Sequence, residues 1–401
     1  MDIEIKRKPE DFIVEEISDI AKDADGKYTI IKFRIRDWDT NKFLIALARI
    51  LRISRKRITY AGTKDKIAVK TQYFCINAPV NISSISLQGV DVLDVFRSNH
   101  FLKLGDLKAN RFIIKIYGID NETIQKKFDE MIENGGFPNY FGMQRFGSVR
   151  RNTHEIGRLI VKGEYEKAVE KYIYDDKFDT EPYRKEFIEN RDYSKALREF
   201  PMRLKFERSL IAYYAREGTL KNAFSTFPND LSIMFVHAFQ SHLFNRFLDE
   251  RIKRYGLGTL LPGDVAYKID EFFNPDKENP ISVNSLNIDK MRKFVAENRI
   301  ALTLPVIGYE VQPEKSEFGE IEYKILDEEN VSPEDFRNRE YPYLSSKGDR
   351  RIIAAKPINF NIVGDSTVDF ILGKGIYATT MLSYFGNIIE GRKNDDYDKA
   401  E

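Results

Sequence analysis

Alternation between apolar and charged residues predicts an antiparallel sheet in the first part of the chain. The clearest case is Tyr28 to Arg36, where apolar side chains point to one face and Lys or Arg side chains point to the other. Such a pattern is typical of a strand with one buried and one solvated face. Val69 to Asn77 is rich in β-branched and aromatic residues and predicts another strand. Met1 to Glu16 predicts two short strand pieces around Pro9.

Helical spacing replaces this alternation in the middle of the chain. A first helix is expected after Asp39, which can cap it, because apolar residues then recur every three or four positions as far as Ile53. From about Tyr165 onward most segments predict helices. These are Glu166 to Tyr174, Asp192 to Glu199, Leu204 to Glu217, Asp230 to Tyr255 and Asp289 to Asn298. The acidic stretch Glu314 to Arg339 predicts a solvated excursion.

Strands return near the end of the chain. Asn359 to Val363 and Thr367 to Leu372 predict a hairpin, followed by a helix from Ala378 to Glu390 and a charged tail. Strands at both ends of a helical middle predict an α+β fold, in which one discontinuous mixed domain carries a large, mostly helical insertion. We place the mixed domain at residues 1–165 and 355–401 and the insertion at residues 166–354. The length of 401 residues also favours two domains.

Composition and charge rule out several kinds of site. The net charge is only +1, so a nucleic-acid surface would have to be a local basic patch. The single cysteine, Cys75, excludes an internal disulfide framework and a cysteine-based zinc site, and with four scattered histidines we expect no structural metal. No signal segment and no membrane-spanning apolar run is present, so we expect a cytoplasmic protein.

The stretch Tyr60 to Ala68 is the first candidate for chemistry. Its small turn places the carboxylate of Asp65 between Lys64 and Lys66, just before a predicted strand. Flanking ammonium groups favour the ionised carboxylate, which would make Asp65 a ready nucleophile or base at neutral pH. On local chemistry alone the alternative is a surface aspartate paired with one of the two lysines.

A second unusual stretch, Phe137 to Gly147, combines four aromatic residues with Asn139, Gln144 and Arg145. It has neither helical nor strand periodicity. Mixed content of this kind suits a site that stacks on a nucleic-acid base and hydrogen-bonds to it. The alternative is an aromatic loop packed against a neighbouring domain.

Together these segments resemble the tRNA pseudouridine synthase D (TruD) family, and an archaeal member is expected. The resemblance lies in four motifs and a weaker fifth: Lys6 to Glu15 (KRKPEDFIVE), Ala61 to Ala68 (AGTKDKIA), Asn139 to Gly147 (NYFGMQRFG), Gly375 to Thr379 (GIYAT) and Ser241 to Arg251 (SHLFNRFLDER). They occur in the family's order and span most of the chain. One departure is Ser383-Tyr384, where the family often has Arg-Glu, which puts any ion-pair role there in doubt.

The resemblance implies a fold, a reaction and roles for individual residues. The fold would be the pseudouridine synthase catalytic domain with a mixed, mostly antiparallel sheet, interrupted by the family's helical insertion. The substrate would be tRNA, at uridine 13 of the D arm, and the isomerisation needs neither cofactor nor metal. Asp65 would be the nucleophile or base and Lys6 its ionic partner, with Lys64 as the alternative partner or a phosphate contact. Phe141 would stack on the uracil, and Asn139 would hydrogen-bond near Asp65 or to the uracil edge. We favour a monomer.

Arginines gather on either side of the two candidate stretches and could bind phosphates. Gln144, Arg145, Arg150 and Arg151 lie in or just after the aromatic stretch and are the expected substrate contacts. The alternative is ordinary surface charge among carboxylates. Two rival classes also remain open: a non-catalytic RNA-binding module, which would lose the aspartate, and a carboxylate-based nucleotide glycosidase, which would need a second acid close to the first.

Overall fold

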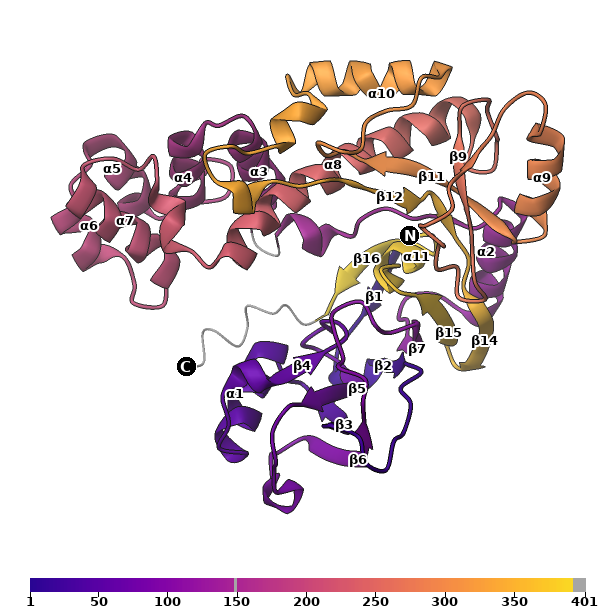
Figure 1. Cartoon of the computed structure of the whole chain (residues 1–401), viewed down its shortest axis with the longest axis horizontal. Coiled ribbons are helices and arrows are strands. Elements are labelled where there is room, and N and C mark those ends of the chain that lie inside the picture. Colours follow the sequence, from indigo (N-terminus) through magenta and orange to yellow (C-terminus); the bar gives the residue numbers. More distant parts are fainter. Residues whose placement is uncertain (148–149, 392–401) are drawn as a thin grey trace. The chain divides into compact units, whose positions relative to one another are not determined.

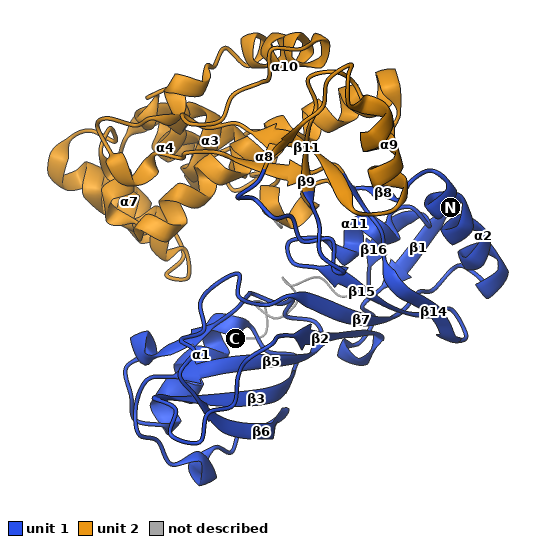
Figure 2. Ribbon diagram, turned by 45° about the vertical axis from the view of Figure 1, so that its right-hand side comes forward, with its two compact units in different colours: residues 1–139, 268–279, 354–401 blue, residues 140–267, 280–353 orange. Residues whose placement is uncertain are grey.

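The chain folds into two compact units, and each of them is assembled from segments distant in the sequence (Figure 2). The computed structural model describes residues 1–147 and 150–391. Unit 1 comprises Met1–Asn139, Lys268–Asn279 and Ala354–Glu401, and unit 2 comprises Tyr140–Tyr267 and Pro280–Ile353. Unit 1 holds the main sheet and unit 2 holds most of the helices, so the predicted α+β class is confirmed.

A mixed sheet of eight strands forms the centre of unit 1 (Figure 1). Its strands are β2 (Phe12–Ile17), β3 (Tyr28–Arg36), β4 (Ile58–Tyr60), β5 (Val69–Ile76), β6 (Val90–Ser98), β7 (Ala109–Lys115), β14 (Ile358–Gly364) and β15 (Thr367–Gly373). Their order across the sheet is β14-β15-β7-β2-β5-β3-β6, with β4 paired to β5 beside this path. Strands β2 and β5 are parallel, and the other pairings are antiparallel.

The helix α1 (Thr40–Ile50) packs against this sheet through an aromatic cluster. Asp39 caps the helix by accepting hydrogen bonds from two backbone N–H groups of the first turn, both at 2.9 Å. The ring of Phe43 packs against Phe33 and Phe74, with centroids 5.4 and 5.2 Å away. The alternation predicted for β3 is confirmed, because its apolar side chains are buried and its arginines are exposed.

The two ends of unit 1 meet in a separate parallel pair of strands, β1 (Asp2–Ile5) and β16 (Asn387–Glu390). The helix predicted from Ala378 to Glu390 is therefore wrong in its second half. Helix α11 (Ala378–Leu382) is short, and the chain then continues into β16. The apolar run of β16 pairs with a strand nearly the whole chain away, and this tertiary pairing overrides the local helical pattern. Unit 1 also contains α2 (Asn121–Glu133) and the small pair β8 (Phe137–Pro138) and β13 (Ala354–Ala355).

Unit 2 is a helical body with a small sheet. Its helices are α3 (Thr153–Val161), α4 (Tyr165–Ile173), α5 (Pro182–Asn190), α6 (Tyr193–Glu199), α7 (Lys205–Glu217), α8 (Asn229–Tyr255), α9 (Ile288–Ala296) and α10 (Glu317–Glu328). The sheet has the order β10-β9-β11-β12, formed by β9 (Val265–Lys268), β10 (Ile281–Ser282), β11 (Ile300–Val306) and β12 (Asp349–Ile352). Helix α8 is the long central element. Gly157 lets α3 cross it closely, because a Cβ there would collide with the backbone of Phe235.

The acidic stretch from Glu314 to Arg339 is not the solvated excursion that its charge predicts. It contains α10, which buries Phe318, Ile325 and even the carboxylate of Glu322. Apolar residues at helical spacing decide the structure here, while the acidic residues of α10 other than Glu322 are exposed. Within the part of the chain that the structure describes, no helix has both the length and the apolar character to cross a membrane.

Candidate active site

The turn that carries Asp65 joins β4 to β5 and is fixed by hydrogen bonds to its backbone. Gln72 lies fully buried on β5, and its side-chain amide donates to the carbonyl of Gly62. The backbone N–H of Gly105 donates to the carbonyl of Ala61 at 2.7 Å. Lys70, two positions before Gln72 on the same strand, donates to the carbonyl of Asp65 at 3.4 Å. Side chains two apart on a strand share one face, so β5 supports both ends of the turn.

Asp65 shares the ammonium group of Lys6 with a second carboxylate. Lys6 Nζ lies 3.3 Å from Asp65 Oδ2 and 2.9 Å from Glu390 Oε1. The side chain of Lys6 is 3% exposed, whereas those of Asp65 and Glu390 are 24% and 35% exposed. Its ammonium also lies 4.6 Å from the ring centroid of Phe12. The cation is thus covered and the two acids remain open to solvent. Glu390 was not expected from the sequence.

Two opposing effects set the protonation state of Lys6. Burial lowers its pKa, but the charges and hydrogen bonds of Asp65 and Glu390 outweigh burial, and the net pKa of Lys6 is raised. Lys6 therefore stays charged at neutral pH and favours the ionised form of its partners. Local sequence alone favours a solvated strand edge for the basic run that begins at Lys6. The structure corrects this for Lys6, whose side chain is buried.

Lys64, the neighbour of Asp65 in the motif, is engaged elsewhere. Its Nζ lies 3.3 Å from Glu16 Oε2, and the two side chains are 4% and 0% exposed. Burial lowers the pKa of Lys64 and raises that of Glu16, against the attraction between them. A covered ammonium with a carboxylate partner is poorly placed to contact a phosphate. The predicted substrate contact of Lys64 stays untested, but these partners favour a structural role.

Lys70 is a buried charge that sequence reasoning missed. Its Nζ donates to the carbonyl of Trp38 at 2.7 Å and lies 3.4 Å from the hydroxyl of Thr40 and from the carbonyl of Asp65. Burial lowers the pKa of Lys70 to about 8, although nearby aspartates including Asp65 oppose the shift. A position inside a strand predicts only alternation, so nothing in the sequence pattern indicates that this lysine binds backbone carbonyls.

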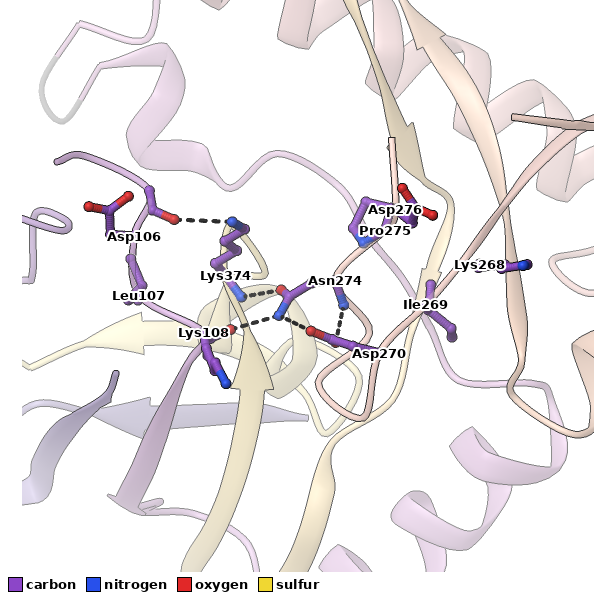
Figure 3. Close-up of a pocket in the computed structure, with 11 residues that line it drawn as sticks. Asp106, Leu107, Lys108, Lys268, Ile269, Asp270, Asn274, Pro275, Asp276 and Lys374 are labelled. Carbon is purple, nitrogen blue, oxygen red and sulfur yellow. Dashed lines mark hydrogen bonds between the residues drawn. The ribbon is translucent and has the colours of Figure 1, made fainter. Parts of the chain in front are cut away.

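A cavity of about 610 Å³ lies beside the loop that hydrogen-bonds to Ala61 (Figure 3). Asn274, from the segment 268–279 that returns to unit 1, organises this cavity. Its side chain donates to the carbonyl of Lys108 at 3.0 Å and accepts from the backbone of Lys374 at 3.1 Å. The ammonium of Lys374 donates to the carbonyl of Gly105 at 3.1 Å. The lining mixes three lysines with three aspartates, so it has no excess charge that would select an anion.

The aromatic stretch, Phe137 to Gly147, begins in unit 1 and continues in unit 2 from Tyr140. Asn139, its last residue in unit 1, is 1% exposed. Asn245 holds the backbone of Phe141 by two hydrogen bonds of 2.9 and 3.0 Å. The half-buried ring of Phe141 meets Phe244 edge to face at 5.4 Å, and the guanidinium of Arg351 lies 4.2 Å from its centroid. The ring is therefore held by its backbone and by a cation, which suits a stacking platform.

The four polar residues expected to contact substrate differ in their surroundings. Gln144 and Arg151 are exposed, and Arg145 is half-buried with its Nε 3.2 Å from Ser241 Oγ. Arg150 is mostly covered and forms ion pairs with Asp179 at 2.9 Å and with Glu207 at 3.8 Å. These partners favour a structural role for Arg150, and its phosphate contact stays untested. In the described ranges no group of three or more His, Cys, Asp or Glu residues could hold a metal ion.

Comparison with known proteins decides the family. The chain matches the family tRNA pseudouridine synthase D (TruD) over residues 1–385. The chain belongs to this family. Accordingly it is a tRNA pseudouridine synthase, an intramolecular isomerase.

Relatives in the TruD family match the chain almost from end to end. It is 58% identical over 395 residues to the probable tRNA pseudouridine synthase D of Thermoplasma volcanium, covering 98% of this chain and 96% of that protein. The Thermoplasma acidophilum protein of the same name is 57% identical over 388 residues, covering 97% and 94%. A crystal structure described as the putative TruD from Methanosarcina mazei superposes with a TM-score of 0.77 at 35% identity, covering 96% of this chain and 94% of that one.

Proposed function

We propose that this enzyme converts uridine 13 in the D arm of tRNA to pseudouridine, with Asp65 as the catalytic nucleophile or base. The proposal is carried by one observation: the family's aspartate motif is intact, and its carboxylate contacts the buried, charged Lys6 while staying accessible. A partly exposed acid held ionised by a covered cation can reach a substrate and react with it.

The reaction requires a carboxylate beside C1′ of the target nucleotide. The C1′–N1 bond breaks, the uracil turns, and C1′ joins C5 without any other reactant. Asp65 can attack C1′ to form a covalent adduct or remove a sugar proton to give a glycal, and both routes agree with its position on the turn. A base stacked inside a helix is out of reach, so the nucleotide has to be flipped out, at a cost of a few kcal/mol.

Other residues of the proposed site hold the flipped nucleotide. Phe141 stacks on the uracil and offsets part of the flipping cost, since aromatic stacking contributes about 1–3 kcal/mol per base. Asn139 is 1% exposed, so of its two expected roles we propose the hydrogen bond near Asp65 rather than a contact with the uracil edge. Gln144, Arg145 and Arg151 contact the surrounding RNA, and the phosphate contacts position it without reading its sequence. We do not extend this role to Lys64 or Arg150, because both have carboxylate partners.

We further propose that residues 1–165 and 355–401 make up the catalytic domain and residues 166–354 the family's helical insertion domain. The main sheet, Lys6 and Asp65 belong to unit 1, and the long run of helices belongs to unit 2, which supports a mixed part and a helical part. The compact units have other boundaries, since unit 2 already begins at Tyr140 and residues 268–279 return to unit 1. A monomer is proposed as the functional state.

The test is to incubate the full-length protein with an unmodified tRNA transcript and to map carbodiimide-resistant adducts along the RNA. The expected result is one pseudouridine, at position 13. Asp65→Asn should give no detectable product while tRNA binding stays within about threefold, roughly 0.7 kcal/mol. Asp91→Asn, which changes an exposed aspartate of β6, is the matched control and should be fully active. Near-normal turnover by Asp65→Asn would overturn the assignment.

One observation favours a second candidate enough to test it. A nucleotide glycosidase needs a second acid near the first, and Glu390 forms an ion pair with the same Lys6 ammonium group as Asp65. A glycosidase would release free uracil and leave an abasic site, whereas an isomerase keeps every atom in the RNA. Chromatography of the small-molecule fraction from the same incubation separates the two, and we expect no uracil in it.

A further inference from the structure

Glu390 is the second carboxylate at Asp65, and no part of the family motifs contains it. It is the last residue of β16 and lies opposite Ile5 in the parallel pair with β1. Because Glu390 Oε1 is 2.9 Å and Asp65 Oδ2 is 3.3 Å from the same Lys6 Nζ, the two oxygens are at most 6.2 Å apart. A uracil placed against Asp65 would therefore have Glu390 within the width of one ring.

The isomerisation also requires removal of the proton at C5, a step that Asp65 need not perform. After C1′ has bonded to C5, that carbon still bears its proton, and pseudouridine forms only when the proton leaves. The proton is acidic, because the adjacent C4 carbonyl and the restored conjugation of the ring stabilise the electron pair left behind. A carboxylate is a strong enough base to remove it, provided that it lies within hydrogen-bond reach.

We propose that Glu390 is the general base that removes the C5 proton; this inference rests on the proposed function. The C5–H bond breaks and its electron pair forms the C5–C6 double bond, while the π pair of the N1–C6 double bond moves onto N1 and the proton goes to the Glu390 carboxylate. The ring nitrogen N1, freed from the sugar, takes a proton from solvent, and Glu390 returns its proton to solvent. One proton is lost at C5 and one is gained at N1, so the product is an isomer and no other reactant is needed.

The surroundings of Asp65 favour Glu390 over other groups for this task. Glu16 is fully covered and tied to Lys64, and Lys6 is held in its charged form, which cannot accept a proton. Lys70 is 1% exposed, so a uracil cannot reach its amine. Glu390 is 35% exposed and its carboxylate is already oriented by Lys6. Of these neighbours it alone combines a free electron pair with access.

The experiment compares two substrates that differ at the atom in question. Glu390→Gln keeps an oxygen for the Lys6 hydrogen bond but cannot accept a proton. On tRNA transcribed with uridine, single-turnover formation of pseudouridine should slow by about 100-fold or more, as expected for loss of a general base. On tRNA transcribed with 5-fluorouridine there is no C5 proton to remove, so the base should still be cleaved and rejoined to the sugar at the wild-type rate, as measured by nucleoside chromatography.

Further variants and an isotope test complete the design. Deuterium at C5 of uridine should slow Glu390→Gln by a primary isotope effect that the wild type does not show. Glu390→Asp, which keeps a carboxylate, should recover a large part of the uridine rate. Glu4→Gln is the control. It removes the carboxylate of a β1 residue that pairs with Arg7, and its rates should match those of the wild type on both substrates.

Several results would overturn the inference. Equal slowing of Glu390→Gln on the two substrates would mean that Glu390 acts only by seating Lys6, and wild-type rates on both would assign the proton to Asp65 or water. Neither outcome touches the proposed function, which fails only if the wild-type protein makes no pseudouridine or if Asp65→Asn remains active on both substrates.

Discussion

The ion cluster around Lys6 in unit 1 and the cluster around Arg184 in unit 2 contain the same kinds of group but expose different ones. Each has a cation that is nearly covered, 3% exposed for Lys6 and 5% for Arg184. Around Arg184 two carboxylates, Asp179 and Glu207, are also covered, at 5% and 10%. A third, Glu181, lies 3.7 Å from Arg184 Nε at the edge of the cluster and is 44% exposed. Around Lys6 both carboxylates are a quarter to a third exposed.

This is the difference expected between a structural ion cluster and the reactive one that we propose around Lys6. When both signs are buried, the charges satisfy each other and no substrate can reach them, so the cluster contributes specificity and costs desolvation. When only the cation is buried, its charge lies beside acids that remain accessible to a substrate. We therefore use the exposure of the acids, rather than the number of ion pairs, as the criterion for the proposed site.

The largest expected effect tests the structural cluster. Arg184→Met removes a buried guanidinium that donates to the carbonyl of Ile173 at 2.7 Å and lies 3.3 Å from Glu207. It leaves the covered carboxylates Asp179 and Glu207 with Arg150 as their remaining cation, so the free energy of unfolding should fall by up to about 3–5 kcal/mol. Denaturant unfolding measures this change. Turnover per folded molecule should equal that of the wild type, and a selective loss of turnover would break the comparison.

The same substitution at the other cation, Lys6→Met, should affect chemistry more than stability. Its partly exposed carboxylates can be hydrated when the cation is lost. The pKa of Lys6 is raised, so its ion pairs contribute full stability below about pH 10 and lose it only as pH rises through the folded pKa. At neutral pH the variant lacks the cation that favours ionised Asp65. The acid limb of the pH–rate profile should then move to higher pH, as measured by single-turnover assays. An unshifted limb with normal activity would contradict the assignment.

Phe141 tests whether partial exposure also marks function in unit 2. Its ring is half-buried, and it is held by Arg351 and Phe244. Phe141→Ala should weaken stabilisation of the flipped base by about 1–3 kcal/mol, seen as a slower single turnover, whereas Phe141→Tyr should be mild because the ring remains. If both variants keep the wild-type rate, Phe141 is a packing residue.

The smallest expected effect separates two neighbouring arginines. Arg151 is exposed, and Arg150 belongs to the covered cluster with Asp179 and Glu207. Arg151→Ala should reduce the slope of log K against log salt for tRNA binding by about 0.7–0.9, the loss of one phosphate contact, without changing the choice of uridine. Arg150→Ala should lower stability and leave the slope as it is. The reverse result would mean that burial is a poor guide to RNA contact here.

The sequence was sufficient where local pattern and structure agree. The alternation of apolar and charged residues predicted β3, and the capping residue Asp39 predicted the start of α1. The resemblance to the family predicted the ion pair between Lys6 and Asp65. The sequence failed where a distant partner decides. The apolar run ending at Glu390 continues a helical pattern, and only pairing with β1 makes it a strand. The role of Lys70 could not be predicted for a similar reason. Its partners include backbone carbonyls, and the residue types in the sequence do not indicate where these lie.

The meeting of β1 with β16 has a consequence for biosynthesis. Lys6 and Glu390 are 384 positions apart, and a ribosome adds about 5–20 residues per second. Lys6 is therefore translated about 20 to 80 s before its second acid exists. For most of that interval the aspartate motif is already made, but β1, the strand just before the lysine, still lacks its partner strand β16. A nascent chain that has not yet reached Glu390 would thus carry the aspartate motif and still lack the completed charge cluster.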